Sequence, residues 1–171
     1  MYNGFQHDLK AVCDLAHAHG AYVYADIIQG VGAVPFDVRA CNVDFAATAS
    51  YKWLMGDFGL GFFYVREDLL GRVARRPHWS YESAVDAEIH LSPTDPRSPT
   101  PVSWTPGPTA GHHFQLGTMA SAVGVALGVS LPYLLDLGVP AIQRHRQPLI
   151  DRIQRELPRL GFIPQTPLDS T

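Results

Sequence analysis

The chain is poor in the residues that mark several classes of protein. Only two of its 171 residues are cysteines, Cys13 and Cys41, which are too few for a disulfide framework. The 13 Lys and Arg residues are outnumbered by 16 Asp and Glu, so a net charge of −3 provides no basic field for nucleic acid. No signal peptide opens the sequence. We therefore expect a cytoplasmic protein that does not bind nucleic acid.

Charged residues are missing from positions 116–135, a run that approaches the length needed to cross a bilayer. The run is diluted by Gly, Ser, Thr and Pro, and no cationic cluster flanks it closely. We expect a buried helix that packs closely through its glycines and alanines, and no membrane association.

Clustered metal ligands are also missing. His17 and His19 are two positions apart, so a helix would point them to different faces, and His112 and His113 have no acidic ligand nearby. No metal site is expected.

A Gly-x-Gly-x-x-Gly turn is absent after the first expected strand, which counts against a nucleotide-binding module.

The sequence pattern alternates between helix and strand. Asp8 can cap a helix over 9–19, and Gly20 can end it. Seven of the 14 prolines lie between Pro77 and Pro108, which predicts a long irregular excursion. The other expected elements are strands at 21–25, 45–48 and 61–65, a helix over 117–136, and a last helix from Pro140 to Gly161 with Pro148 inside it and an apolar stripe expected in the core.

These strands are continuous apolar runs, which are typical of a buried parallel sheet in an α/β layer structure. Ligands of such proteins gather at the carboxyl ends of the strands. Asp26 follows the first expected strand, and Lys52 follows the second. The sequence therefore predicts a site that contains both residues.

Lysine occurs only at Lys10 and Lys52. Lys52 lies just after one expected strand and before the next, where its amine could form a Schiff base with pyridoxal phosphate (PLP). Asp26 would keep the pyridine nitrogen protonated, so that the ring can absorb electrons when a bond to the substrate Cα breaks. Gln29 could hydrogen-bond the phenolic oxygen, and Ser50 could donate to the phosphate. Tyr51 is a further candidate donor.

In this order and spacing the residues resemble the class V aminotransferase group of fold type I PLP enzymes, which includes cysteine desulfurases and isopenicillin N epimerase-like proteins. The segment from Asp26 to Val38 is similar to the group's Asp-x-x-Gln-x-x-Gly-x-x-Pro-x-Asp-Val pattern. Asp44-Phe45 and Ser50-Tyr51-Lys52-Trp53-Leu54 continue the match, as does Gly117-Thr118. The resemblance covers roughly residues 3–165.

The resemblance implies part of a three-layer PLP-binding large domain over 1–138, and a linking helix with the start of a small C-terminal α+β domain over 139–171. It implies a homodimer in which Thr118 reaches the cofactor phosphate of the other subunit, and an amino acid as substrate. Because only about three strands are expected, we predict a fragment with unpaired sheet edges and uncovered apolar faces that does not catalyse alone.

Two departures from the family pattern leave the reaction open. Many members have His at the position of Tyr51, and a tyrosine there is reminiscent of kynureninases. Asp57 replaces a proline often found after the glycine that follows the lysine. Transamination, epimerisation and elimination remain possible, with kynureninase-like hydrolysis or cysteine desulfurase-like lysis as alternatives. A catalytically inactive fragment that only binds a partner or dimerises is a further alternative.

Overall fold

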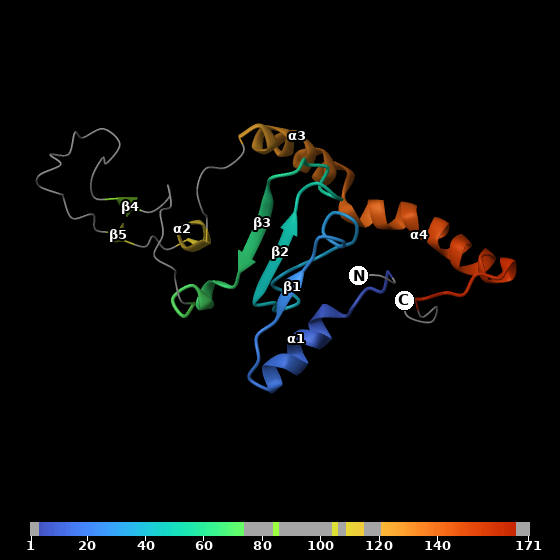
Figure 1. Cartoon of the computed structure of the whole chain (residues 1–171), viewed down its shortest axis with the longest axis horizontal. Coiled ribbons are helices and arrows are strands. Elements are labelled where there is room, and N and C mark those ends of the chain that lie inside the picture. Colours follow the sequence, from blue (N-terminus) through green and yellow to red (C-terminus); the bar gives the residue numbers. More distant parts are fainter. Residues whose placement is uncertain (1–3, 74–83, 86–103, 106–108, 115–120, 167–171) are drawn as a thin grey trace, which may run out of the picture. The chain divides into compact units, whose positions relative to one another are not determined.

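The computed structural model describes residues 4–73, 84–85, 104–105, 109–114 and 121–166. The chain divides into two compact units, one of residues 1–64 with 120–171 and the other of residues 65–119. The first unit contains the sheet and the long helices (Figure 1). The predicted domain limits near residue 138 stay a prediction, although α4 belongs to the same compact unit as the strands.

Helix α1 (Leu9–Ala18) begins where the sequence predicted. The Asp8 carboxylate caps it by accepting a 3.0 Å hydrogen bond from the Ala11 amide, which satisfies one of the unpaired amides of the first turn. Cys13 is buried on the face that packs against the sheet, with Val43 and Ala46. Burial raises the pKa of the Cys13 thiol, as expected for a small apolar core residue.

The sheet has three strands in the order β1-β2-β3, with bounds Tyr24–Asp26, Phe45–Ala49 and Gly61–Val65. Strands β1 and β2 are parallel. Figure 1 shows β3 running opposite to β2, so the prediction of an all-parallel sheet was wrong. The segment between β2 and β3 is shorter than the dozen or so residues that a parallel crossover needs, so it makes a hairpin connection.

Strand β1 begins three residues later than predicted. Gly20 has a φ of +71°, and the Ala21 amide still bonds the Ala16 carbonyl at 2.9 Å, so the helix end occupies the start of the predicted strand. The Val23 amide then bonds the Asp44 carboxylate at 2.7 Å. The ladder therefore starts only at Tyr24.

The two faces of this sheet differ. One face packs on α1 around Cys13, Val43 and Ala46. The other carries a row of ring contacts that joins Tyr22, Tyr24, Phe45 and Phe63. Tyr24 is 61% exposed, so the prediction of fully buried strands was wrong for β1 and β3. Uncovered apolar surface was itself predicted for a sheet this small, and that is confirmed.

Helix α3 (Ser121–Leu137) is buried along only one face. Val123, Leu127 and Leu134 pack with Leu54. Val125 on the other side is 73% exposed, so the predicted burial is confirmed for one face and wrong for the other. Close packing through the glycines was also wrong, because a Cβ at Gly124 or Gly128 would meet no described atom within 4 Å. Nothing among the described residues covers the outer face.

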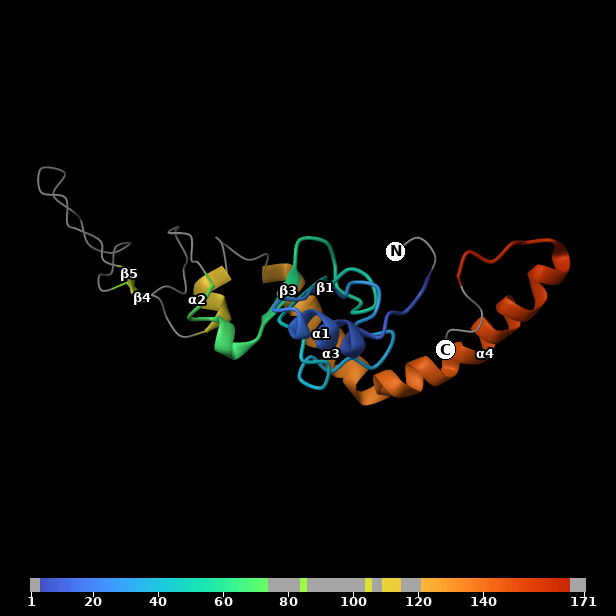
Figure 2. The ribbon, with the colours of Figure 1, turned by 90° about the horizontal axis from the view of Figure 1, so that it is seen from below.

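Helix α4 (Val139–Glu156) follows α3 at Gly138, where φ is +76°, and a 3₁₀ turn (η2, Pro158–Leu160) ends it. Its predicted core stripe is wrong beyond Ile142: that residue packs partly buried against the core cluster of α3, and none of the residues of α4 is fully buried. Figure 2 shows the reason: beyond its first turns, α4 extends away from the strands of its own unit.

Among the described residues no single helix is long and apolar enough to cross a membrane, whereas the bent pair of α3 and α4 passes that test by length and composition.

The second unit has a 3₁₀ turn (η1, Glu67–Leu69), a two-stranded antiparallel ribbon of β4 (Ala84–Val85) and β5 (Trp104–Thr105), and a short helix, α2 (Ala110–Phe114). Arg66 and Asp68 form an ion pair at 2.6 Å, which lowers the pKa of Asp68. Most of the predicted irregular excursion between Pro77 and Pro108 lies outside the described residues.

Candidate active site

Lys52 lies on the loop that joins β2 to β3. The Ser50 amide bonds the Leu60 carbonyl at 3.0 Å, which closes the base of the loop. Within it, the Met55 amide bonds the Lys52 carbonyl at 3.1 Å and the Gly56 amide bonds the Ser50 carbonyl at 2.9 Å. These bonds fix the backbone on both sides of Lys52, whose side chain is half-buried.

Two glycines allow this loop to fold back on its own strand. A Cβ at Gly56 would lie 2.6 Å from the Ser50 side chain, and one at Gly61 would lie 2.6 Å from the Thr48 carbonyl oxygen. Both distances are shorter than van der Waals contact, so any other residue would push the loop away. The sequence shows these glycines, but only the fold reveals what they approach.

The Ser50 hydroxyl is fully buried and lies 2.9 Å from the Asp57 carbonyl and 3.0 Å from the Leu60 carbonyl. A hydroxyl has one hydrogen to donate, and here it is directed at the loop backbone. Ser50 therefore braces the lysine loop in this structure, whereas the sequence predicted a phosphate contact.

The Tyr51 ring stacks on Phe58, with centroids 4.7 Å apart and planes 24° apart. The Lys52 Nζ lies 5.8 Å from the Tyr51 centroid, at the outer limit of a cation–π contact. Phe58 is 73% exposed, so the amine is bordered by an exposed aromatic pair. The sequence predicted a hydrogen-bond donor at Tyr51, and the structure shows its ring contacts.

Asp26 ends β1 with its carboxylate exposed. One carboxylate oxygen accepts a 3.0 Å bond from the Ile28 amide, which shapes the turn that carries Gln29, also exposed. Asp26 is opposite Ala47 in the parallel register, and the Ile27 amide continues the ladder to the Ala47 carbonyl at 2.9 Å. Asp26 and Lys52 therefore follow neighbouring strands at the same carboxyl edge of the sheet, as predicted.

Thr118, the predicted phosphate contact between subunits, lies outside the described residues.

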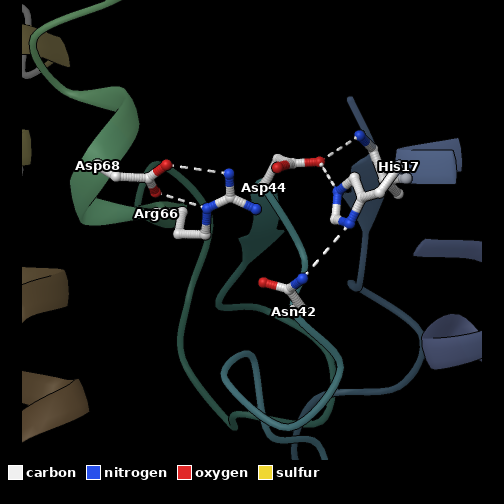
Figure 3. Close-up of polar contacts among 6 residues, drawn as sticks. His17, Asn42, Asp44, Arg66 and Asp68 are labelled. Atoms are coloured by element: carbon white, nitrogen blue, oxygen red, sulfur yellow. Dashed lines mark hydrogen bonds and ion pairs between the residues drawn. The ribbon is translucent and has the colours of Figure 1, made fainter. Parts of the chain in front are cut away.

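A polar network that the sequence did not predict supports both strands (Figure 3). Asp44, at the start of β2, is fully buried, and one of its oxygens accepts from the Val23 amide at 2.7 Å and from His17 Nε2 at 2.8 Å. The Asn42 amide nitrogen lies 3.4 Å from His17 Nδ1, which fits an imidazole with its proton on Nε2. The network ties the end of α1 to the beginnings of β1 and β2, which lead to Asp26 and Lys52.

A profile of the aminotransferase class V family matches residues 2–167, nearly the whole chain. The chain belongs to the class V aminotransferase family. Among curated proteins it is 31% identical over 147 residues to a cysteine desulfurase of Klebsiella pneumoniae. The matched segment covers 86% of this chain and 33% of that protein. The chain thus spans about a third of the length of this relative.

Solved structures show the same fold. The apo cysteine desulfurase of Thermococcus onnurineus superposes with a TM-score of 0.72 at 21% identity, over 95% of this chain and 37% of that one. A lysine-to-alanine mutant of C-DES, with glycine covalently linked to its PLP cofactor, superposes with a TM-score of 0.69 at 21% identity. The superposition covers 96% of this chain and 40% of that one. The predicted fold, part of a fold type I large domain, is confirmed.

The family is one of PLP enzymes, and the residues present fit that group in part. One edge of the sheet carries the half-buried amine of Lys52, the carboxylate of Asp26 and the exposed amide of Gln29. One oxygen of the Asp26 carboxylate is not bonded within the described residues. In the cofactor, the amine suits the aldehyde, the carboxylate suits the ring nitrogen and the amide suits the phenolic oxygen. Ser50 does not offer its hydroxyl to a phosphate in this arrangement.

Proposed function

We propose that this protein is a PLP-dependent enzyme that acts on an amino acid, with Lys52 as the residue that binds the cofactor. The observation that carries the proposal is the parallel register of β1 and β2, which brings the only lysine of the loop and the Asp26 carboxylate to one edge of the sheet. Family membership supports the choice of cofactor.

Bound PLP would supply an electron sink for the charge that develops when a bond to the substrate Cα breaks. Lys52 would hold the cofactor aldehyde covalently and then move the proton at the substrate Cα as general acid and base. Asp26 would accept a hydrogen bond from the ring nitrogen and keep it protonated. Gln29 would donate its amide hydrogen to the phenolic oxygen.

The remaining predicted contacts extend this proposal. The protein would be a cytoplasmic homodimer. In it, the Thr118 hydroxyl would donate a hydrogen bond to the cofactor phosphate bound by the other subunit. Ser50 would reach a phosphate only if its hydroxyl turned away from the Asp57 and Leu60 carbonyls, so we assign it first to the shape of the lysine loop. Tyr51 and Phe58 would border the amine as a stacked pair.

For the reaction, the names of the relatives favour a cysteine desulfurase-type lyase. Tyr51, which stands where many members have His, keeps a kynureninase-like hydrolase and an aminotransferase as competing reactions. Supplying L-cysteine with a thiol reductant and measuring sulfide together with alanine separates the first from the others. Equal release of sulfide and alanine that requires Lys52 would support the desulfurase, whereas amino transfer to a keto acid without sulfide would replace it with transamination.

The proposal as a whole is tested by adding PLP and recording its visible absorbance. Wild-type protein and Lys10→Ala should develop the absorbance band of lysine-bound PLP, because Lys10 is exposed and paired with Asp14 at 2.7 Å, on α1. Lys52→Ala should not. An unchanged band in Lys52→Ala would refute the assignment, and no band in any variant would favour a binding or dimerisation module without catalysis.

A further inference from the structure

Arg146 on α4 contacts both the lysine loop and the separate segment that contains Ala33. Its Nη1 donates a 2.8 Å hydrogen bond to the Ala33 carbonyl, and its Cζ lies 4.7 Å from the centroid of the Trp53 ring. Ala33 is buried, and the guanidinium is partly buried between the two contacts. A planar cation can donate at its edge and stack with its face, so Arg146 makes both contacts at once.

The same two segments also touch through their backbones. Gly32 has a φ of +85°, and a Cβ there would lie 2.8 Å from the Trp53 carbonyl oxygen. Trp53 is therefore held on two sides, with its backbone against Gly32 and its ring under Arg146. The result is a clamp of Arg146, Trp53 and the 32–33 segment.

The clamp joins the two halves of the candidate site. Trp53 directly follows Lys52, and residues 32–33 follow the turn that begins at Asp26 and carries Gln29. Arg146 belongs to the same compact unit as both loops. We propose that Arg146 is a positioning residue, which holds the Lys52 backbone at a fixed place relative to the Asp26 turn; its relevance to cofactor attachment rests on the function proposed above.

A substrate-binding role suits Arg146 less well. One terminal nitrogen is used by the Ala33 carbonyl, and the face of the guanidinium is used by the Trp53 ring. Both contacts stabilise protein segments. The competing explanation is that Arg146 merely anchors α4 and contributes to global stability.

Two substitutions separate the contacts. Arg146→Lys keeps a donor for the Ala33 carbonyl but loses the planar stack, and Arg146→Met loses both. Arg144→Met is the matched control, because Arg144 is exposed on the same helix. The reporters are the amides of Met55 and Gly56, which bond the Lys52 and Ser50 carbonyls. The Phe45 amide, bonded to the Val23 carbonyl at 3.0 Å, reports on the sheet.

We expect hydrogen exchange at Met55 and Gly56 to become about tenfold faster in Arg146→Met, since a cation–π contact and a charged hydrogen bond are lost together. Arg146→Lys should fall between Arg146→Met and wild type, and Arg144→Met should match wild type. Exchange at Phe45 should be unchanged. Equal acceleration at Phe45, or no acceleration at Met55 and Gly56, would overturn the proposal.

A second measurement connects the clamp to the cofactor. Borohydride trapping after a short incubation with PLP should label Lys52 more slowly in Arg146→Met than in Arg144→Met, with background labelling of Lys10 the same in both. Equal rates at Lys52 would refute the role in attachment. If wild-type Lys52 takes no label at all, the proposed function fails, whereas the exchange experiment still decides whether Arg146 positions the loop.

Discussion

The two sides of the candidate site are built differently. The lysine side is enclosed: Ser50 is fully buried, backbone bonds flank Lys52, and Gly56 and Gly61 fit against atoms that leave no room for a Cβ. The aspartate side is open, with an exposed carboxylate that makes one local bond to the Ile28 amide. Changes on the lysine side should therefore act first through folding, and changes on the aspartate side first through chemistry.

The largest effect is expected at Asp26. Asp26→Ala should reduce turnover by about 100-fold or more while changing PLP retention little, because the carboxylate matters most when charge develops on the ring. Stability should fall by about 0.5–1 kcal/mol, because the Ile28 amide loses its acceptor. Turnover and retained absorbance are measured on the same preparation of whichever form of the protein is active. Near-normal turnover would show that Asp26 is not the partner of the ring nitrogen.

Where the segment after the Asp26 turn meets the lysine loop, Gly32→Ala should destabilise the fold by about 3 kcal/mol, since it combines a positive φ with a clash against the Trp53 carbonyl. Gly124→Ala is the control: Gly124 lies in α3 with open space around its Cα, so alanine should stabilise by about 0.5–1 kcal/mol. Denaturant unfolding gives both values. A Gly32→Ala protein as stable as wild type would mean that the loop is not enclosed in solution.

A smaller contrast is expected between the two faces of α3. Leu127, which is 3% exposed, would lie 2.9 Å from a Cβ at Gly56, so it packs directly under the lysine loop. Leu127→Ala should cost about 2–3 kcal/mol, and Val125→Ala, on the exposed face, less than about 0.5 kcal/mol. Equal losses would indicate that the outer face of α3 is covered in solution, for example by a second subunit.

Local patterns predicted the local structure. The Asp8 cap, the strand at 61–65 and the placement of Asp26 and Lys52 at strand ends all depend on residues close in sequence, and all are confirmed. Long-range contacts were missed. The bond between His17 and Asp44 spans 27 positions, and that between Arg146 and Ala33 spans 113.

The errors have a related cause. Apolar spacing predicted that both faces of the sheet and the stripe of α4 would be buried, because periodicity shows which residues suit a core without showing what covers them. Leu160 in η2 is 72% exposed, although it completes that stripe. The chain spans about a third of the length of the relative that it matches at 31% identity.

The central claim is that the enclosed loop presents Lys52 to the cofactor, and peptide mapping after borohydride reduction in the presence of PLP tests it most directly. The chain has only one other lysine, Lys10, so each protein molecule carries its own internal control. We expect the reduced label on the peptide that contains Lys52, with Lys10 at background. A label confined to Lys10, or divided equally between the two, would contradict the account.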